Sequence, residues 1–585
     1  MTDQFERLKG VLAIRDGIVQ SIVSGTVLLA LGVLSCAPSD RPTGKEPSSP
    51  TGALFSDITE QSGVRFEHDP AISGSYYYPE IMGSGGGFLD YDNDGDLDIY
   101  LVNGAGRGVS DGDAPPLRNR LFRQEQDGTF VDVTESSGLG DTGFGMGMAV
   151  GDIDNDGDVD VYVTNVGPDV LYRNEGDGTF TDITEAAGIA NAEWGASATF
   201  FDFDRDGHLD IYVANYVAFD TTIVCTDLSG RRDYCGPPFY SGVADVLYRN
   251  NGDGTFSDVS VAVGIASVAA AGLGVVAADF TGDTYPDIYV ANDGEPNQLW
   301  INQRDGTVRD EALGFGAAVN ALGHAEAGMG IAIGDSDNDG AVDLFVTHLR
   351  GESNTLYRSG SGAFYDETFR AGIAGPGIPF TGFGTGFVDY DNDGDLDLIV
   401  VNGRVLGGPL LTSRDPAGYW DAYAEPNLVF ENDGFGRFRD VSDGEPEFSH
   451  EIANSRALAF GDIDNDGDVD LLITTGGGEA RLIRNNGTPG AHWLLVRAVI
   501  PTLNRDAIGA GITVVTGERR FYRLIISGYS YMSSNDLRAH FGLGGATTVD
   551  EIVVLWPDGT KEVFPGTGAD QIITLEKGRG TSMNE

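Results

Sequence analysis

Short runs in which apolar and polar residues alternate recur along most of the chain, and such alternation predicts β-strands. Residues 145–184 show the full order of elements. A glycine-rich apolar run at 145–151 is followed by an acidic loop and by a β-branched run at 159–165. A third run at 170–174, a Gly-Asp-Gly turn and a last run at 180–184 complete the unit. The pattern predicts four antiparallel strands per unit.

The acidic loop between the first two predicted strands has the spacing of a cation site. It reads Asp-Ile-Asp-Asn-Asp-Gly-Asp-Val-Asp from Asp152 to Asp160, and five carboxylates this close repel one another unless a cation lies among them. Oxygen ligands at positions 1, 3, 5 and 9, glycine at position 6 and a free backbone carbonyl at position 7 suit calcium. An EF-hand would need Glu at position 12, where this chain has Val163 inside a predicted strand. We therefore expect a calcium loop between two strands.

The loop occurs seven times in the chain. The fourth copy departs from the pattern, with Thr281 at position 3 and Thr284 at position 6. A lone acidic loop is usually a solvated turn, but seven copies in register favour calcium binding, at six or seven sites depending on the fourth copy. The predicted ligands at positions 1, 3, 5, 7 and 9, with position 7 acting through its backbone carbonyl, are Asp90, Asp92, Asp94, Asp96 and Asp98; Asp152, Asp154, Asp156, Asp158 and Asp160; Asp202, Asp204, Asp206, His208 and Asp210; Asp279, Thr281, Asp283, Tyr285 and Asp287; Asp335, Asp337, Asp339, Ala341 and Asp343; Asp389, Asp391, Asp393, Asp395 and Asp397; and Asp462, Asp464, Asp466, Asp468 and Asp470.

Seven four-stranded units predict an all-β fold, a seven-bladed β-propeller in which each loop joins the first and second strands of a blade. Insertions at 104–117, 216–242 and 404–425 lengthen three of the units. The seventh unit lacks its fourth strand, and residues 55–59, Phe-Ser-Asp-Ile-Thr, match that missing strand. We therefore expect the N-terminal strand to complete the last blade and to cover its open edge.

These motifs carry a family resemblance. The acidic loops, with Leu-Tyr-Arg-Asn and Gly-Asp-Gly-Thr-Phe, resemble FG-GAP/VCBS repeats, the blades of integrin α propellers. The tail resembles an ASPIC/UnbV domain through His-Trp-Leu at 492–494, Asn-Arg-Asp-Ala-Ile-Gly-Ala at 504–510, Ser-Gly-Tyr-Ser at 527–530, His-Phe-Gly-Leu-Gly at 540–544 and Trp-Pro-Asp-Gly at 556–559. Together they place the chain near the cartilage acidic protein family. The resemblance implies calcium binding, export and extracellular interaction, and no established enzymatic reaction.

The expected boundaries follow from these motifs and from the N-terminus. Residues 1–36 are an export segment, 37–52 a flexible tether, 53–489 the propeller, 490–578 the ASPIC/UnbV domain and 579–585 a short tail. Alternating runs in the ASPIC/UnbV segment predict a small β-domain beside the last blade. Within it, Arg505, Asp506, Arg538 and His540 are candidates for a polar site, although buried ion pairs that hold turns in place are the simpler interpretation.

The N-terminus and the charge indicate where the protein acts. Arg7, Lys9 and Arg15 precede an apolar stretch, and the sequence up to Cys36 resembles a bacterial lipobox with Cys36 as the lipidated residue. A plain transmembrane anchor is the alternative. In either case we expect an exported protein of the cell envelope or cell surface, monomeric and attached to the membrane only through this anchor. The net charge of −54 argues against nucleic acid or anionic lipid as partners.

The other two cysteines, Cys225 and Cys235, lie ten residues apart in one insertion. With Cys36 lipidated they are the only available pair, so we expect a disulfide. Arg231, Arg232 and Tyr234 lie at the tip of this hairpin and are residue types common in binding hot spots. We expect them to bind a protein or glycan partner; the alternative is that the hairpin merely caps a blade.

The sequence contains no recognised nucleophile, zinc-protease or phosphate-loop motif. His324 and Glu326 are two residues apart on an extended segment and point to the same side. They keep open the alternative of an envelope enzyme that acts on polysaccharide through the propeller channel. Polar loop residues without a catalytic role are the favoured interpretation, and the favoured function is a calcium-dependent interaction module.

Overall fold

The computed structural model describes residues 52–104, 117–227, 229–412 and 418–583. Residues 50–585 form one compact unit. The expected export segment, most of the tether and Cys36 lie outside the described residues. Among the described residues, no helix is both long and apolar enough to cross a membrane.

The second repeat shows how the sequence folds. β6 (Gly145–Gly151), β7 (Asp160–Asn165), β8 (Val170–Asn174) and β9 (Phe180–Asp182) pair in this order as an antiparallel sheet. The acidic loop joins β6 to β7, as the alternating pattern predicts. A four-residue helix, α5 (Thr184–Ala187), follows β9 and ends at Gly188, which has a left-handed backbone with φ 79°.

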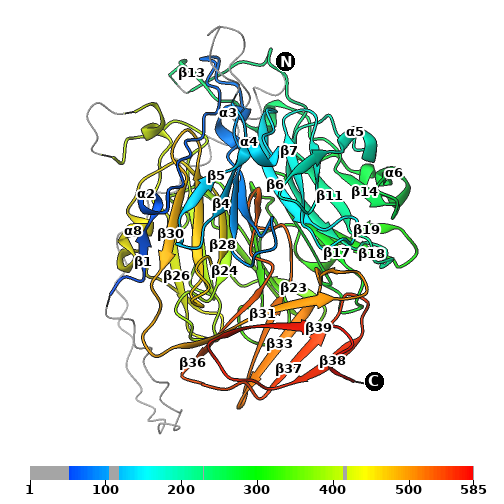
Figure 1. Ribbon diagram of the computed structural model, residues 1–585. Coiled ribbons are helices and arrows are strands. Elements are labelled where there is room, and N and C mark those ends of the chain that lie inside the picture. Colours follow the sequence, from blue (N-terminus) through cyan, green and yellow to red (C-terminus); the bar gives the residue numbers. More distant parts are fainter. Residues whose placement is uncertain (1–51, 105–116, 228, 413–417, 584–585) are drawn as a thin grey trace, which may run out of the picture. The chain divides into compact units, whose positions relative to one another are not determined.

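The described residues contain six more sheets built in this way (Figure 1). Their strands are β2 (Gly86–Leu89), β3 (Asp98–Leu101), β4 (Arg120–Gln124) and β5 (Phe130–Asp132); β10 (Gly195–Phe201), β11 (Asp210–Asn215), β14 (Val246–Asn250) and β15 (Phe256–Asp258); β16 (Gly272–Ala278), β17 (Asp287–Asn292), β18 (Gln298–Asn302) and β19 (Val308–Asp310); β20 (Ile331–Gly334), β21 (Asp343–Val346), β22 (Thr355–Gly360) and β23 (Ala363–Asp366); β24 (Gly382–Val388), β25 (Asp397–Asn402), β26 (Leu428–Asn432) and β27 (Phe438–Asp440); and β28 (Ser455–Gly461), β29 (Asp470–Thr475), β30 (Arg481–Asn485) and β1 (Phe55–Asp57).

The first strands of these sheets contact one another in a closed cycle, β2, β6, β10, β16, β20, β24, β28 and back to β2. This arrangement explains why the first strands are rich in glycine. A Cβ atom on Gly274 would collide with the carbonyl of Met329, and one on Gly330 would collide with that of Phe383. Small residues therefore let the inner strands approach closely, and the β-propeller class is confirmed.

The N-terminal strand closes the ring. β1 pairs with β30 through Phe55 and Asn485, so the seventh sheet combines the two ends of the repeat region. Phe55 is 1% exposed and packs against Tyr390 and Phe448, and its backbone N–H donates to Glu445. The predicted closure is confirmed, since the strand pairs where an open edge would otherwise remain.

The remaining elements of the repeat region are short. They are α2 (Thr59–Ser62), α3 (Pro79–Met82), α4 (Thr134–Ser137), α6 (Ser260–Val263), α7 (Ala312–Phe315) and α8 (Pro446–Ser449), the 3-10 turns η1 (Pro237–Phe239), η2 (Ile265–Ser267), η3 (Tyr419–Ala422) and η4 (Ser442–Gly444), and the hairpin strands β12 (Cys225–Thr226) and β13 (Arg232–Asp233).

The tail forms two small sheets. β31 (His492–Ile500) lies between β36 (Ala539–Gly544) and β39 (Gln571–Glu576), with β32 (Arg505–Asp506) at its end. The second sheet has the order β34 (Arg519–Leu524), β33 (Gly511–Thr516), β37 (Glu551–Leu555), β38 (Lys561–Pro565) and β40 (Thr581–Ser582).

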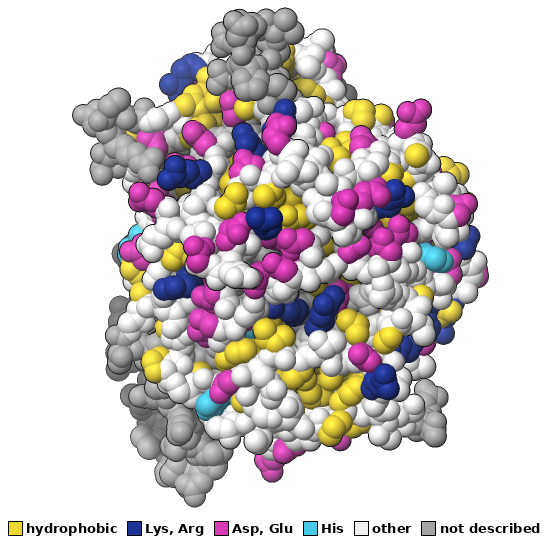
Figure 2. Space-filling model, in the orientation of Figure 1, with side chains coloured by type: hydrophobic (Ala, Val, Ile, Leu, Met, Phe, Trp, Pro, Cys, Tyr) yellow, Lys and Arg dark blue, Asp and Glu magenta, His cyan; other side chains and the backbone are white. Residues whose placement is uncertain are grey.

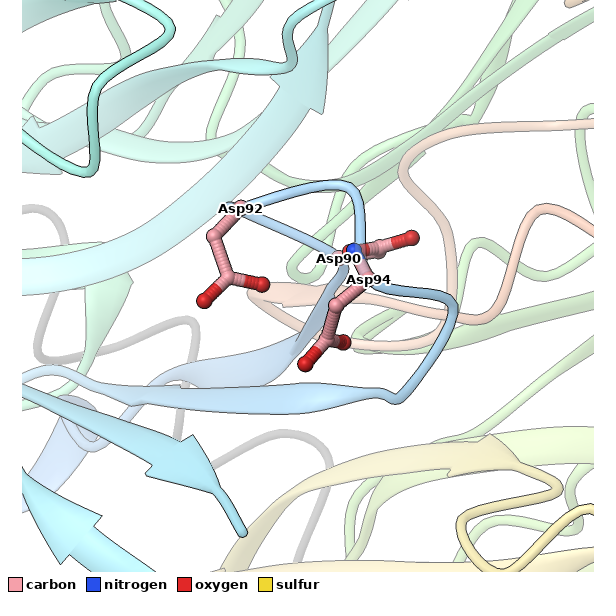
Figure 3. A group of neighbouring side chains, drawn as sticks. All are labelled: Asp90, Asp92 and Asp94. Atoms are coloured by element: carbon pink, nitrogen blue, oxygen red, sulfur yellow. The ribbon is translucent and has the colours of Figure 1, made fainter. Parts of the chain in front are cut away.

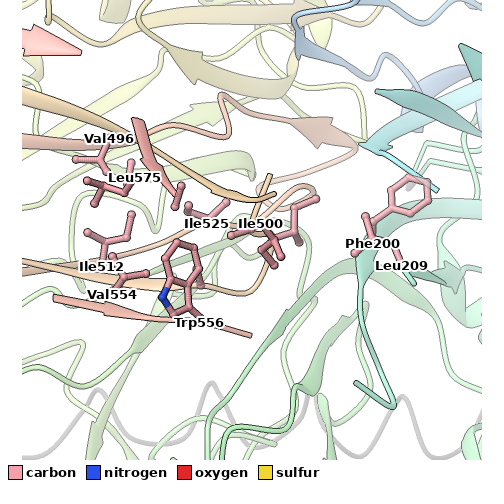
Figure 4. Close-up of a cluster of buried hydrophobic side chains, with 14 of the residues drawn as sticks. Phe200, Leu209, Val496, Ile500, Ile512, Ile525, Val554, Trp556 and Leu575 are labelled. Carbon is pink, nitrogen blue, oxygen red and sulfur yellow. The ribbon is translucent and has the colours of Figure 1, made fainter. Parts of the chain in front are cut away.

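The position of the tail differs from the expectation of a domain beside the last blade. Its core residues Val496, Ile512 and Trp556 form one buried cluster with Phe200 and Leu209 of the third repeat (Figure 4). The tail also bonds to acidic loops in the second, third, sixth and seventh sheets through Arg505, Arg519 and Arg538. It therefore packs across the loop-bearing side of the ring, because that side offers it both apolar and polar partners.

Candidate functional site: the acidic loops and the tail

In each acidic loop the first carboxylate closes the turn. Asp152 accepts the N–H groups of Asp156 at 3.2 Å and of Gly157 at 2.8 Å. The turn needs a left-handed backbone at two positions, and Asn155 and Gly157 supply it with φ 62° and 100°. Asn and Gly adopt this conformation more readily than other residues. The sequence Asp-Asn-Asp-Gly therefore specifies the turn locally.

The ninth residue of each loop is buried and binds the backbone. Asp160, 1% exposed, accepts the N–H groups of Ile153 and of Asn174, each at 2.8 Å. Burial raises the pKa of Asp160 well above its usual value. In the other loops the equivalent residues, which accept an N–H from the third strand in the same way, are Asp98, Asp210, Asp287, Asp343, Asp397 and Asp470. Position 9 thus anchors the loop to its sheet as well as facing the other carboxylates.

Carboxylates converge in these loops as a cation site requires. Oxygens of three carboxylates lie within 4.8 Å of one another in several loops, among them Asp90, Asp92 and Asp94 (Figure 3); Asp152, Asp154 and Asp160; Asp202, Asp204 and Asp206; Asp335, Asp337 and Asp339; and Asp389, Asp391 and Asp397. Burial, with the neighbouring Asp156 and Asp154, raises the pKa of Asp152 to about 7. A positive charge beside Asp152 would favour the charged form of this carboxyl and lower its pKa again.

Three buried carboxylate oxygens in these loops have no hydrogen-bond partner among the described residues. They are Oδ1 of Asp204, of Asp337 and of Asp389. A buried carboxylate oxygen without a partner is costly. Position 3 carries Asp204 and Asp337, and position 1 carries Asp389, so all three stand at predicted ligand positions. The donor set is oxygen alone and fits a hard cation such as calcium.

The fourth loop is poorer in acidic ligands. Asp279 closes the turn by accepting N–H groups of Gly282, Asp283 and Thr284 at 2.7–3.0 Å. Thr281 replaces the carboxylate of position 3. Arg304 lies 2.7 Å from Asp283 and neutralises it in part. This loop offers a cation fewer carboxylates than its neighbours, in which Asp204 and Asp337 are likewise paired, with Arg249 and Arg358.

The loops are joined to one another, which the sequence analysis missed. In six loops the residue at position 4 has a left-handed backbone, and its side chain donates a hydrogen bond to the residue at position 6 or 7 of the next loop. The donor–acceptor distances are 2.6–3.2 Å. The bonds run from Asn93 to Asp158, from Asn155 to the Gly207 carbonyl, from Arg205 to Thr284, from Asn338 to Asp395, from Asn392 to Asp468 and from Asn465 to Asp96. The recurrent Asn at position 4 was the available signal.

A second set of bonds links neighbouring loops through the third strands. The side-chain amide that ends the third strand donates to the carbonyl at position 2 of the preceding loop, at 2.7–3.0 Å. The donors are Gln124, Asn174, Asn250, Asn302, Asn432 and Asn485. The Asn of Leu-Tyr-Arg-Asn is therefore a connector between blades.

The tail binds these loops through arginines. Arg505 donates to Asn155 Oδ1 at 2.8 Å, and Arg538 donates to Asn465 Oδ1 at 2.6 Å. Arg519 lies 2.9 Å from Asp395. His540 Nε2 is 3.0 Å from the Gly467 carbonyl. Arg538 and His540 both bind the seventh loop, whereas Arg505 binds the second. The tail polar residues are therefore divided between loops and fasten the tail to the propeller.

The same is true of the fourth tail candidate. Asp506 pairs with Arg497 at 2.7 Å, within the tail itself. The interpretation of these polar residues as buried pairs and turn-holding groups therefore fits the structure better than a shared polar site.

A segment of the tail, residues 527–535, occupies the centre of the ring. Ser530 exchanges backbone hydrogen bonds with Ile331 at 2.8 and 2.9 Å. β35 (Ser533–Ser534) pairs with β2 in parallel, and Asn535 Oδ1 accepts the N–H of Phe460 at 3.0 Å. These partners lie on first strands of three different sheets. A ligand that entered the channel would therefore meet this segment.

The other candidates separate in the structure. Glu326 accepts a hydrogen bond from Thr355 and lies 4.0 Å from the buried His348, whereas His324 is exposed. No hydrogen bond or ion pair joins His324 to Glu326 among the described residues.

The cysteine hairpin is partly as expected. Cys225 and Cys235 form a disulfide, which confirms that prediction. Arg231 and Arg232 are exposed, and Arg231 pairs with Asp227. The expectation that Tyr234 lies exposed at the hairpin tip is wrong.

Tyr234 is 2% exposed and does not stand at an accessible tip. Its hydroxyl lies 3.3 Å from Glu80 and 3.1 Å from the Tyr419 hydroxyl, and its ring packs against Tyr76 and Tyr423. Aromatic residues of two other segments bury it. Tyr234 therefore anchors the hairpin rather than meeting a partner.

A ring of four-stranded sheets with an acidic loop in each, closed by the N-terminal strand, defines a propeller of the FG-GAP class. The profile of the FG-GAP-like repeat matches residues 90–163, 153–213, 227–290, 279–346 and 337–400, and the profile "ASPIC and UnbV" matches 501–582. The chain belongs to the FG-GAP-like repeat family and ends in an ASPIC and UnbV domain.

Cartilage acidic protein 1 has the same architecture. The Mus musculus protein is 27% identical over 380 residues, which span 55% of this chain and 58% of the relative. The Xenopus tropicalis protein is 25% identical over 392 residues, 61% of this chain and 48% of the relative. The chain thus spans about half the length of these curated relatives.

Two solved structures illustrate the more distant likenesses. An Agrocybe aegerita lectin that recognises terminal N-acetylglucosamine is 16% identical, with a TM-score of 0.36, over 68% of this chain and 86% of the lectin. A rhamnogalacturonan lyase of Bacillus licheniformis is 14% identical, with a TM-score of 0.36, over 69% of this chain and 72% of the lyase. At these scores neither likeness bears on function.

Proposed function

We propose that the protein is a calcium-binding interaction module of the cell exterior, exported and anchored through the N-terminal segment. The observation that carries the proposal is the set of buried, unpartnered oxygens of Asp204, Asp337 and Asp389 at predicted ligand positions. A cation would satisfy all three. The disulfide between Cys225 and Cys235 suits an oxidising compartment.

Electrostatics favours the same conclusion. The chain has a net charge of −54, and acidic side chains are spread over much of the face shown in Figure 2. Within each loop the carboxylates repel one another at close range. Calcium bound at one hundred times its dissociation constant would stabilise the fold by about 2.7 kcal/mol per independent site. Several loops together would make folding depend on calcium.

Calorimetry with calcium and with a chelator tests the proposal. We expect chelation to lower the melting temperature sharply and equilibrium dialysis to find six or seven ions. Asp156→Ala should remove one ion and leave the others. Asp177→Ala, which alters a Gly-Asp-Gly turn outside the loops, is the matched control and should keep all of them. An unchanged melting temperature on chelation would refute calcium binding as a structural requirement.

A further inference from the structure

The first and sixth acidic loops have the same sequence but different surroundings. Both read Asp-Tyr-Asp-Asn-Asp-Gly-Asp-Leu-Asp, at 90–98 and at 389–397. In the first loop residues 92–95 are exposed, whereas every residue of the sixth loop is buried or half-buried. Each of the other loops exposes at least one residue. Any difference in how the first and sixth loops hold a cation must therefore come from the residues around them.

The backbone of the tail lies directly on the sixth loop. The N–H of Gly542 donates to Asp389 Oδ2 at 3.0 Å, and the N–H of Gly544 donates to the Asn392 carbonyl at 2.8 Å. A Cβ atom on Gly542 would stand only 2.2 Å from Asp389 Oδ2 and 2.6 Å from Asn392 Cα. The two chains are thus too close for a side chain to fit between them.

Two tail arginines hold the other half of the sixth loop. Arg519 donates to the Asp393 carbonyl at 2.8 Å and to Asp395 Oδ1 at 2.9 Å. Arg523 donates to the Gly394 carbonyl at 3.2 Å. Positions 5, 6 and 7 of the loop are therefore bonded to the tail, and moving the tail away would break all of these bonds.

The tail stands further from the first loop. A Cβ atom on Gly394 would lie 2.5 Å from the ring of Phe521 in the tail, whereas one on Gly95, at the same position of the first loop, would meet open space. A cavity of about 290 Å³ separates the first loop from the tail and is lined by Asp90, Asn93 and Gly95 on the propeller side. Solvent therefore reaches the first loop, while the tail occupies the equivalent space at the sixth.

The covered loop contains a buried carboxylate oxygen that points to a cation. Asp389 is 2% exposed, and its Oδ2 accepts the N–H groups of Gly394 at 2.9 Å and of Gly542. Its Oδ1 has no hydrogen-bond partner among the described residues. Oxygens of Asp389, Asp391 and Asp397 lie within 4.8 Å of one another. A cation among them would offset the cost of leaving that oxygen without a partner.

We propose that the tail seals the sixth loop, so that a cation bound there leaves only when the tail moves away from the propeller. Release from the sixth loop then needs a local opening of the structure, which is a rare event when many contacts must break together. The first loop has the same ligands and releases its cation directly to solvent. The inference rests on the proposed calcium function and adds to it a role for the tail in retaining one ion.

Isotope exchange on the full chain tests the inference. The protein is loaded with radioactive calcium and then transferred to saturating unlabelled calcium, which keeps the loops filled and the chain folded. We expect one ion per chain to exchange at least tenfold more slowly than the others. Asp391→Ala, at position 3 of the sixth loop, should abolish this slow phase. Asp92→Ala, at position 3 of the first loop, is the matched control and should remove one fast ion and keep the slow phase.

A second variant tests whether the tail retains the ion. Arg519→Ala removes two hydrogen bonds to the sixth loop from an exposed side chain, and we expect the slow ion to exchange at least tenfold faster. Arg520→Ala is the control, because Arg520 is also exposed but its side chain lies on the opposite face of β34, and it should leave the exchange rate unchanged. Melting temperatures in saturating calcium establish that both variants fold.

Three results would overturn the inference and leave the calcium function intact. The first is exchange of all bound ions at a single rate. The second is a slow phase that survives Asp391→Ala, because the slow ion would then lie in another loop. The third is a slow phase that Arg519→Ala does not accelerate, because the tail would then not retain the ion. If the chain binds no labelled calcium and chelation leaves the melting temperature unchanged, the proposed calcium function itself fails.

Discussion

Tyr531 lies in the tail segment 527–535, and truncating its side chain tests whether this segment stabilises the ring. It is 0% exposed. Its ring lies 4.9 Å from that of Phe383, and its hydroxyl donates to the Met82 carbonyl at 3.1 Å. Because the inner strands of a closed ring surround Tyr531, the space left by truncating its side chain cannot easily collapse. We therefore expect Tyr531→Ala to be strongly destabilising.

The magnitude follows from two contributions. Truncating a buried aromatic side chain to Ala costs about 3–5 kcal/mol. Within this, losing the hydrogen bond costs about 1 kcal/mol, since it leaves a buried carbonyl unpaired. Tyr531→Phe keeps the packing and loses only the hydrogen bond, so it should cost about 1 kcal/mol. Comparing the loss of unfolding free energy in Tyr531→Ala with that in Tyr531→Phe therefore separates the contribution of packing from that of the hydrogen bond.

Guanidinium denaturation in saturating calcium measures the free energy of unfolding. Tyr365→Ala is the control, because Tyr365 is 52% exposed on the rim of the fifth sheet, and a surface change there should cost less than about 0.5 kcal/mol. If Tyr531→Ala lost no more than the control, the segment would not hold the ring together. The reasoning about the channel would then be wrong.

Two further predictions concern the ring and a buried histidine. Deleting residues 53–59 removes β1 and leaves β30 as an open edge, so light scattering and calorimetry should show aggregation or broadened unfolding; a monomer that unfolds as sharply as the parent would contradict the closure. Burial lowers the pKa of His348 from 6.5 to about 4. Its neutral form therefore stabilises the fold above pH 6.5, and this contribution is lost as pH falls toward 4. Between pH 7 and pH 4.5 the melting temperature of His348→Gln should fall less than that of the parent protein. An equal fall would contradict the role given to His348.

Sequence alone predicts the features that depend on residues close together in the chain. The turn at Asp152, Asn155 and Gly157 needs only neighbouring residues, so its spacing reveals both the loop and its repeat. Alternation of apolar residues gives the strands in the same way. The closure by Phe55 was predictable because one strand motif was missing at one end and present at the other.

What the sequence could not predict depends on distant partners. Asn155 is visible as a repeated residue, but its bond to the next loop spans more than fifty positions of chain. Tyr234 looked exposed because it lies on a hairpin, whereas Tyr76 and Tyr423 from remote segments bury it. The polar residues near Ser530 gave no sign of insertion into the ring, because their partners are backbone groups of separate sheets.

The tail and the acidic loops are joined by hydrogen bonds. Arg505 and Arg538 bond to position-4 side chains, and those side chains join one loop to the next. If the loops bind a cation as proposed, the cation would also order the surface on which the tail docks, and by reciprocity a docked tail would raise the affinity of the loops for it. The same tail places residues 527–535 against the inner strands, so ordering of the loops and insertion of this segment are linked through one domain.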